Sequence, residues 1–169
     1  MVSINIRLEK PSDIQSIHAI TVAAFLDAPH TDHTEQFIID SLRDSGVLTI
    51  SIIAEDSNGA VGHVALSPVT ISDGSSDWYG LGPISVTPNQ QGKGIGSELM
   101  YAAIAELKKL NANGCVLLGD PNYYTRFGFE PMDGLMLPDV PPEYFQAISL
   151  QNDRPLGTVT YHESFLAKD

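Results

Sequence analysis

The sequence is poor in basic residues and lacks long hydrophobic runs. Its 169 residues include 9 Lys and Arg against 21 Asp and Glu, which gives a formal net charge of −12. Binding to nucleic acid or to anionic membranes depends on basic patches, so this balance argues against both kinds of partner. No segment approaches the roughly 20 apolar residues of a membrane span, and residues 1–10 lack the apolar core of a signal peptide. We therefore expect a cytoplasmic protein.

Cysteine is also scarce, because Cys115 is the only one in the chain. A single cysteine excludes an internal disulfide. Cys115 opens the apolar run 115–118, whereas a nucleophilic cysteine usually lies in polar, electropositive surroundings. We expect a buried core thiol, and we predict no metal site.

The length of the chain favours one domain over residues 1–169. Alternating and helical spacings of apolar residues predict the order β-α-α-β-β-β-α-β-(α)-β-β, which implies an α/β fold with a mixed sheet and helices packed on it. Thr34 is a candidate cap for the second helix. Gly82 and Pro83 interrupt one strand and indicate a bulge or a local splaying. The expected strands are 4–8, 47–54, 60–71, 78–86, 114–118, 143–150 and 157–161. The first expected helix starts at 11–13 and breaks at Ala28–Pro29, the second follows Thr34 and ends at 44–46, and the others are 94–111 and 122–127.

A glycine-rich segment, Gln91 to Gly96, lies between an expected strand and the longest expected helix. Its three glycines leave backbone N–H groups open to a ligand. The start of a helix adds unpaired donors and partial positive charge. Together these features predict a binding site for a pyrophosphate.

Two familiar phosphate loops fit this segment poorly. A P-loop needs a Ser or Thr after its Lys, but Gly94 follows Lys93, and Thr87 stands where its first glycine belongs. A dinucleotide loop needs Gly-x-Gly-x-x-Gly in a βαβ unit, usually at the start of the fold. Here the spacing is Gly-x-Gly-x-Gly, after the fourth expected strand.

The segment Ile84 to Ser97 resembles the acyl-coenzyme A loop of the GNAT superfamily of N-acetyltransferases. The family pattern is Gln/Arg-x-x-Gly-x-Gly/Ala after a strand that ends in Val-x-Pro. Matching residues are Val86, Pro88, Gln91, Gly94 and Gly96. A later segment, 118–129, looks like the family's Tyr-x-x-x-Gly-Phe element through Tyr124, Gly128 and Phe129. This segment and the tail after it resemble a bacterial subfamily of largely uncharacterised members.

The resemblance implies a GNAT-type sheet, mostly antiparallel, flanked by helices and splayed at its central strands. It also implies acetyl-CoA as the acetyl donor and co-substrate. Backbone N–H groups of the loop would hold the diphosphate, and the strand before it would pair with the pantetheine arm. The implied cofactor-binding residues are Ile84, Ser85, Val86, Gln91, Gly92, Lys93, Gly94, Ile95, Gly96, Ser97 and Asn122.

The chemistry implied is direct attack of a primary amine on the thioester carbonyl. Tyr124 matches the tyrosine that often protonates the leaving thiolate, and a backbone N–H of 84–86 is the candidate oxyanion donor. No residue is identified as the base; the candidates are His30, Asp32, His33, Glu35 and His63. The acceptor is a small-molecule or peptide amine, a homodimer is possible, and the alternative function is a non-catalytic acyl-coenzyme A sensor.

Overall fold

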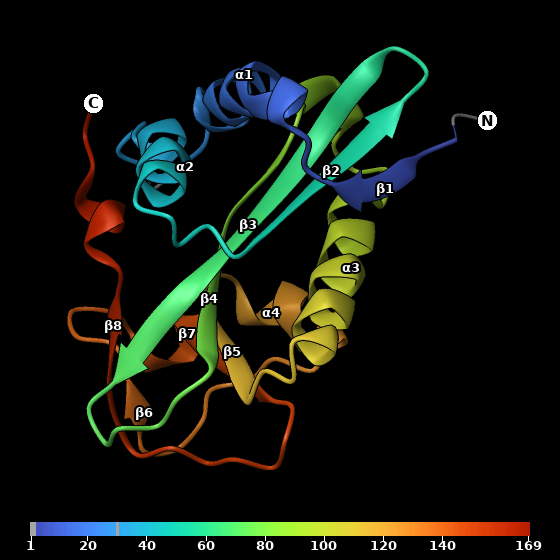
Figure 1. The fold of residues 1–169 in the computed structure, drawn as a ribbon. Helices are drawn as coiled ribbons and strands as arrows, with labels where there is room; N and C mark the ends of the chain where they lie inside the picture. Colours follow the sequence, from blue (N-terminus) through green and yellow to red (C-terminus); the bar gives the residue numbers. More distant parts are fainter. Residues whose placement is uncertain (1–2, 30) are drawn as a thin grey trace. The chain divides into compact units, whose positions relative to one another are not determined.

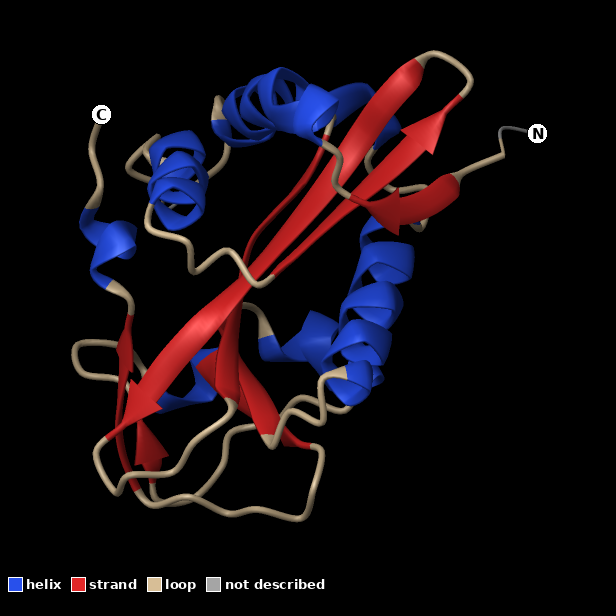
Figure 2. Ribbon diagram, in the orientation of Figure 1, coloured by secondary structure: helices blue, strands red, loops and turns tan. Residues whose placement is uncertain are grey.

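The computed structural model describes residues 3–29 and 31–169. Figures 1 and 2 show the arrangement of its strands and helices. The strands are β1 (Asn5–Leu8), β2 (Ile50–Asp56), β3 (Gly59–Ile71), β4 (Trp78–Val86), β5 (Gly114–Leu118), β6 (Leu135–Met136), β7 (Phe145–Ser149) and β8 (Gly157–Tyr161). The α-helices are α1 (Ile14–Phe25), α2 (Glu35–Asp44), α3 (Ile95–Lys109) and α4 (Pro121–Tyr124), and short 3-10 helices lie between them.

The expected α/β fold with a mostly antiparallel sheet is confirmed. In the described residues the strands form an eight-stranded sheet in the order β1-β2-β3-β4-β5-β7, with β8 paired to β3 and β6 paired to β8. The pairs β1–β2, β2–β3, β3–β8 and β5–β7 are antiparallel. The pairs β4–β5 and β6–β8 are parallel.

Several local predictions need correction. β2 begins at Ile50 rather than at 47, because the N–H groups of Val47 and Leu48 both bond to the Leu42 carbonyl at the end of α2. Thr34 occupies the N-cap position of α2, but its side chain makes no capping bond. The two-residue strand β6 was not predicted, since so short a segment has no periodicity to detect.

The chain divides into two compact units, which are described separately. Unit 1 comprises the residues up to Leu66, Gly82–Ile104 and Glu163–Asp169. Unit 2 comprises Ser67–Leu81 and Ala105–His162.

In unit 1, the first half of β3 is packed on both faces. One face carries a buried cluster of Ile17 from α1, Ile39 from α2, Ile53 from β2 and Ala65 from β3. Successive side chains of a strand point to opposite faces, so Gly62 faces the other way. A Cβ there would lie 3.1 Å from a Leu99 methyl and 3.2 Å from an Ile95 methyl, both on α3. The missing side chain therefore allows α3 to pack closely on β3.

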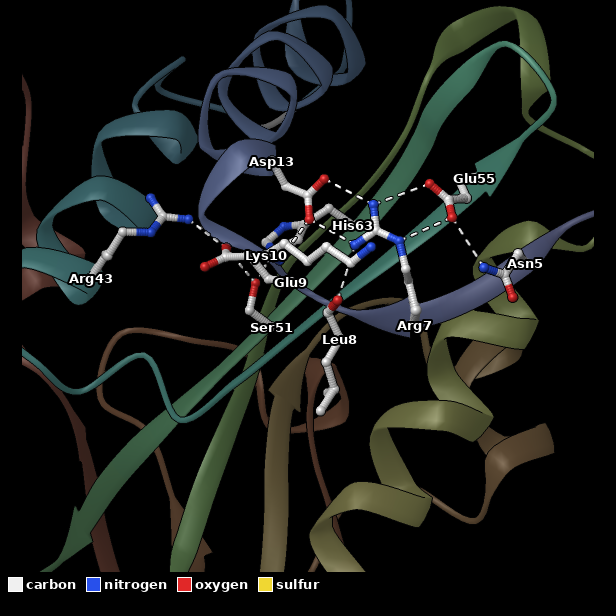
Figure 3. A network of polar contacts seen from close by, with 10 residues as sticks. All are labelled: Asn5, Arg7, Leu8, Glu9, Lys10, Asp13, Arg43, Ser51, Glu55 and His63. Atoms are coloured by element: carbon white, nitrogen blue, oxygen red, sulfur yellow. Dashed lines mark hydrogen bonds and ion pairs between the residues drawn. The ribbon is translucent and has the colours of Figure 1, made fainter.

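A network of charged side chains joins the first strands of unit 1 to the start of α1 (Figure 3). Arg7 donates from Nη1 and Nη2 to the two carboxylate oxygens of Asp13, at 2.7 and 2.9 Å. It also donates from Nε and Nη2 to Glu55, at 3.0 and 3.1 Å. These charge-assisted bonds, with the Lys10 N–H donating to Asp13 at 2.6 Å, lower the pKa of Asp13 to about 2.

In unit 2, the core forms around a single tryptophan. Trp78 is buried, and its Nε1 donates to Asp153 at 3.0 Å. Gly114 lies opposite Trp78 in the parallel β4–β5 ladder, and the indole ring occupies the space where a Cβ of Gly114 would be. Cys115 is fully buried, and burial raises the pKa of its thiol, so the expectation of a core thiol is confirmed. The other core residues are Val69, Ile71, Val116, Leu135, Phe145, Ala147 and Val159.

We expect Gly114→Ala to lower the free energy of unfolding by about 1–3 kcal/mol, the usual cost of overpacking a core. The added Cβ would meet the Trp78 ring and would lie 2.7 Å from the Ile148 carbonyl oxygen, which cannot rotate away. Urea denaturation would measure the loss. Gly80→Ala is the matched comparison, because its closest contacts, at 3.1–3.4 Å, are side-chain atoms. Equal losses in the two variants would contradict this account.

We expect Asp13→Asn to cost about 2 kcal/mol of stability at pH 7, because it removes hydrogen bonds to a charged arginine. The native pKa of Asp13 is depressed from an ordinary value near 3.8 to about 2. Its contribution is therefore complete above about pH 4 and disappears as the pH falls to about 2. Denaturation midpoints at several pH values should show wild type and variant converging in acid. Asp44→Asn, at an exposed position, should show no such convergence.

Candidate functional site

The predicted loop follows β4 and leads directly into α3. A 3-10 turn, Pro88–Gln90, comes first, and α3 begins at Ile95. The loop is anchored to unit 1 by backbone and side-chain bonds: the Thr87 N–H donates to the Val61 carbonyl at 2.9 Å, and Gln91 Nε2 donates to the Val86 carbonyl at 3.0 Å. Gln91 thus folds the loop back onto the end of β4.

Two glycines give the loop a backbone shape that other residues rarely adopt. Gly92 has φ +77° and Gly94 has φ +85°. No atom lies within 4 Å of a Cβ built at either position, so conformation rather than crowding selects glycine here. Residues 91–94 are exposed, and the start of an α-helix lacks the preceding carbonyl groups to which later N–H groups bond. The loop therefore offers a ligand backbone donors at the positive end of a 15-residue helix.

The other loop residues differ in exposure. Ile95 is buried, while Gly96 and Ser97 are partly buried. Lys93 is exposed, and its Nζ donates to Gln90 Oε1 at 3.3 Å. Its ammonium group therefore lies beside the loop, where it is hydrogen-bonded to the side-chain amide of Gln90.

The segment that the sequence predicts to pair with the pantetheine arm, Ile84–Val86, forms the end of β4 in unit 1. Ile84 and Val86 are partly buried, and Ser85 is 3% exposed. Upstream of it, the Gly82–Pro83 peptide bond is cis and Gly82 has φ +141°, while β4 continues through both residues.

Tyr124 and Asn122 lie in unit 2, on the short helix α4. Asp120 caps this helix through its side chain, which accepts from the Asn122 N–H at 2.9 Å, and Pro121 occupies the first turn. The Tyr124 ring stacks edge-on against Tyr123, with centroids 4.9 Å apart. The Asn122 side chain is exposed.

The Tyr124 ring fits beside Gly119, where a Cβ would lie 2.8 Å from ring atom Cδ2. Burial is the main cause of a raised pKa for Tyr124, and the nearby Tyr123 and Asp120 add to it. The hydroxyl therefore keeps its proton at neutral pH, as a proton donor must. Gly128, the other motif glycine, ends the turn after α4 with φ +99°.

The candidate bases have separate surroundings in unit 1, and His30 lies outside the described residues. His33 has φ +59° and its N–H donates to Thr31 Oγ1 at 3.0 Å. Glu35 accepts from the same hydroxyl. Asp32 lines a cavity of about 640 Å³ with Thr34 and the C-terminal residues Phe165, Leu166, Ala167 and Lys168.

Sequence reasoning missed the C-terminal segment of this cavity. Ser41 Oγ on α2 donates to the buried Ser164 Oγ at 2.8 Å and thereby fixes residues 163–166 against α2. A serine in a polar tail carries no local signal of this contact. His63, named among the candidate bases, lies fully buried on β3.

Within residues 3–29 and 31–169, no three His, Cys, Asp or Glu side chains are placed to hold a metal ion. In the same part of the chain, no helix has both the length and the apolar character to cross a membrane.

The fold, with its glycine-rich loop before α3, can be compared with those of known proteins. Residues 48–131 match the family described as Acetyltransferase (GNAT) domain. Over 126 residues, the chain is 35% identical to the uncharacterized N-acetyltransferase YhbS of Escherichia coli K12, covering 74% of this chain and 72% of that one. The chain belongs to the GNAT family of N-acetyltransferases.

Two solved structures resemble almost the whole chain. A GNAT family acetyltransferase from Brucella melitensis, crystallised with acetyl-CoA, is 42% identical with a TM-score of 0.86, covering 96% of this chain and 98% of that one. The YhbS protein of Escherichia coli, crystallised with CoA, is 32% identical with a TM-score of 0.87, covering 98% and 93%.

Proposed function

We propose that this N-acetyltransferase moves the acetyl group of acetyl-CoA to a primary amine of a small molecule or peptide, by direct attack on the thioester. The observation that carries the proposal is the loop between β4 and α3. Its positive-φ glycines, Gly92 and Gly94, open backbone donors at the start of a long helix. The similar proteins from Brucella melitensis and Escherichia coli, crystallised with acetyl-CoA and CoA, support the choice of donor.

The proposed roles follow from the chemistry of coenzyme A. Its diphosphate accepts hydrogen bonds from backbone N–H groups of Gly92, Lys93, Gly94, Ile95, Gly96 and Ser97, and the Lys93 ammonium adds charge. Gln91, whose N–H donates to the Pro88 carbonyl at 3.4 Å, shapes the loop through its side chain. Its pantetheine amides pair with Ile84, Ser85 and Val86 as an added strand pairs with a sheet edge. Asn122 is a further contact to the cofactor.

Acetyl transfer requires that the developing oxyanion is stabilised and that the departing sulfur receives a proton. A backbone N–H of 84–86 stabilises the oxyanion that develops on the thioester carbonyl. Tyr124, protonated at neutral pH, donates a proton to the departing sulfur. The net charge of −12 suits a cationic amine acceptor, whose approach it favours electrostatically.

Two measurements test this function in sequence. A thermal-shift titration with acetyl-CoA should raise the melting temperature, because a ligand that binds only the folded state stabilises it. A thiol-release assay over amines, polyamines, amino acids and peptides should then identify a turned-over acceptor. No thermal shift would contradict the proposed donor. Binding without turnover for any amine would favour a non-catalytic acyl-coenzyme A sensor.

We expect Gly94→Ala to weaken acetyl-CoA binding about tenfold, since a left-handed conformation costs an L-residue roughly 1–2 kcal/mol. The variant loop would either keep the left-handed conformation at this cost in free energy or adopt another conformation that does not bind the ligand. Isothermal titration calorimetry would measure the affinity. Gly46→Ala is the matched control, because Gly46 has a similar φ of +74° and equally open surroundings but lies at the end of α2. Gly94→Ala with wild-type affinity would count against the loop as the binding site.

We expect Tyr124→Phe to lower kcat about 10²-fold, the lower range for loss of a general acid, while acetyl-CoA binding persists. The ring and its packing remain, and only the hydroxyl is lost. Steady-state kinetics and calorimetry on the same preparation would separate the two effects. Tyr123→Phe, which removes the neighbouring hydroxyl, should keep near-normal turnover. Unchanged turnover in Tyr124→Phe would remove this residue from the mechanism.

A further inference from the structure

His63 is a fully buried histidine at the inner end of a hydrogen-bonded chain in unit 1 (Figure 3). Its Nε2 lies 2.7 Å from Ser51 Oγ on β2. Ser51 Oγ donates to Glu9 Oε1 at 2.8 Å, and the same oxygen accepts from Arg43 Nη2 at 2.6 Å. The Glu9 side chain is 18% exposed, so the chain of bonds runs from the sheet interior to solvent.

The direction of these bonds determines which ring nitrogen carries hydrogen. A hydroxyl has one hydrogen, and that of Ser51 is donated to Glu9. Ser51 Oγ must therefore accept at its contact with His63, which places the ring hydrogen on Nε2. In the neutral ring, Nδ1 then carries a bare lone pair.

Burial, with the nearby Arg43, keeps the ring neutral. Burial is the main cause that lowers the pKa of His63, and the Arg43 guanidinium on α2 adds to it, against the opposing effect of Asp13 before α1; the resulting pKa is about 3. Glu9, also before α1, reaches the ring only through Ser51. The Nδ1 lone pair is thus available throughout the physiological pH range.

This lone pair has no hydrogen-bond partner in the described part of the chain. Buried polar atoms are nearly always paired, so an unpaired nitrogen on a fully buried side chain points to a partner from outside the protein. Ser85 Oγ on β4 is another buried side-chain atom without a partner in the described residues, as are Ser67 Oγ on β3 and Thr87 Oγ1 after β4. The bond from the Thr87 N–H to the Val61 carbonyl sets the antiparallel register that places Ser85 opposite His63 on the same face.

We propose that His63 Nδ1 and Ser85 Oγ anchor the water that removes a proton from the attacking amine. The inference rests on the proposed function, in which Ser85 belongs to the strand that holds the acetyl donor. His63 is then a positioning residue for proton transfer, and Ser51 and Glu9 hold its ring in the required tautomer.

The proton steps balance. The amine nitrogen bonds to the thioester carbon, the carbon–sulfur bond breaks, and the sulfur takes a proton from Tyr124. The nitrogen, made acidic by its new bond, gives a proton to the anchored water, which releases one of its own to solvent, and Tyr124 regains its proton from solvent when product leaves. His63 stays neutral throughout, because its pKa is about 3, and its Nδ1 only accepts the hydrogen bond that orients the water.

The test removes the hydroxyl that orients the ring. We expect Ser51→Ala to lower kcat about 10²-fold at neutral pH, with acetyl-CoA affinity unchanged, and Ser51→Thr to restore most of the activity. Thr21→Val is the matched control, because Thr21 is fully buried in unit 1 and its hydroxyl donates to the Ile17 carbonyl at 2.7 Å, outside the chain of bonds. Its turnover should stay near that of wild type.

A second readout reports the tautomer itself. Side-chain 1H–15N spectra of the wild type should show His63 with hydrogen on Nε2, and Ser51→Ala should shift the ring toward a mixture of tautomers. A wild-type ring with hydrogen on Nδ1 overturns the inference, as does wild-type kcat in a folded Ser51→Ala. A wild type that binds acetyl-CoA but acetylates no amine overturns the proposed function, and the inference about His63 with it. An active wild type with an active, folded Ser51→Ala overturns only the inference about His63.

Discussion

Close packing against both faces of β3 is the constraint on which unit 1 depends. On one face, Ala65 lies in the cluster that α1 and α2 cover. On the other, Gly62 allows Ile95 and Leu99 of α3 to approach within van der Waals distance of the backbone. Ile95 is also the first residue of α3, so the start of the helix packs directly on β3 at Gly62. The residue after the loop's glycines is thus packed against a glycine some 30 residues upstream in the sequence.

The charge distribution explains why the proposed donor site relies on backbone groups. The protein carries a net charge of −12, and two of its few arginines are already engaged. Arg7 is bound by Asp13 and Glu55, and Arg43 is bound by Glu9. Lys93 is the cation of the loop itself. A diphosphate at this loop would be held mainly by N–H dipoles, which keep their direction whatever the net charge of the surface.

Local pattern predicted much of the fold and part of the candidate site. β4 and β5 have the predicted bounds, because their apolar runs end at strong turn residues. The loop could be recognised from the sequence because Gly92 and Gly94 have positive φ angles, a conformation that glycine adopts more readily than other residues. The motif tyrosine, Tyr124, lies on the expected short helix, which begins with the local Asp120–Pro121 capping signal. A predicted strand boundary was wrong where another element took the backbone hydrogen bond. The Val47 N–H bonds to the end of α2, so Val47 does not join β2.

The sequence by itself therefore determined the family, the loop and the elements whose signals lie within a few residues of each other. Tertiary structure alone decided the contacts that give buried polar groups their roles. Ser51 bonds to Glu9 across 42 positions and to His63 across 12, and Ser41 bonds to Ser164 across 123. Nothing near any of these residues in the sequence marks its partner, since a hydrogen bond between distant segments depends on where the packed core brings them. The protonation of the His63 ring is a property of that packing and of no local motif.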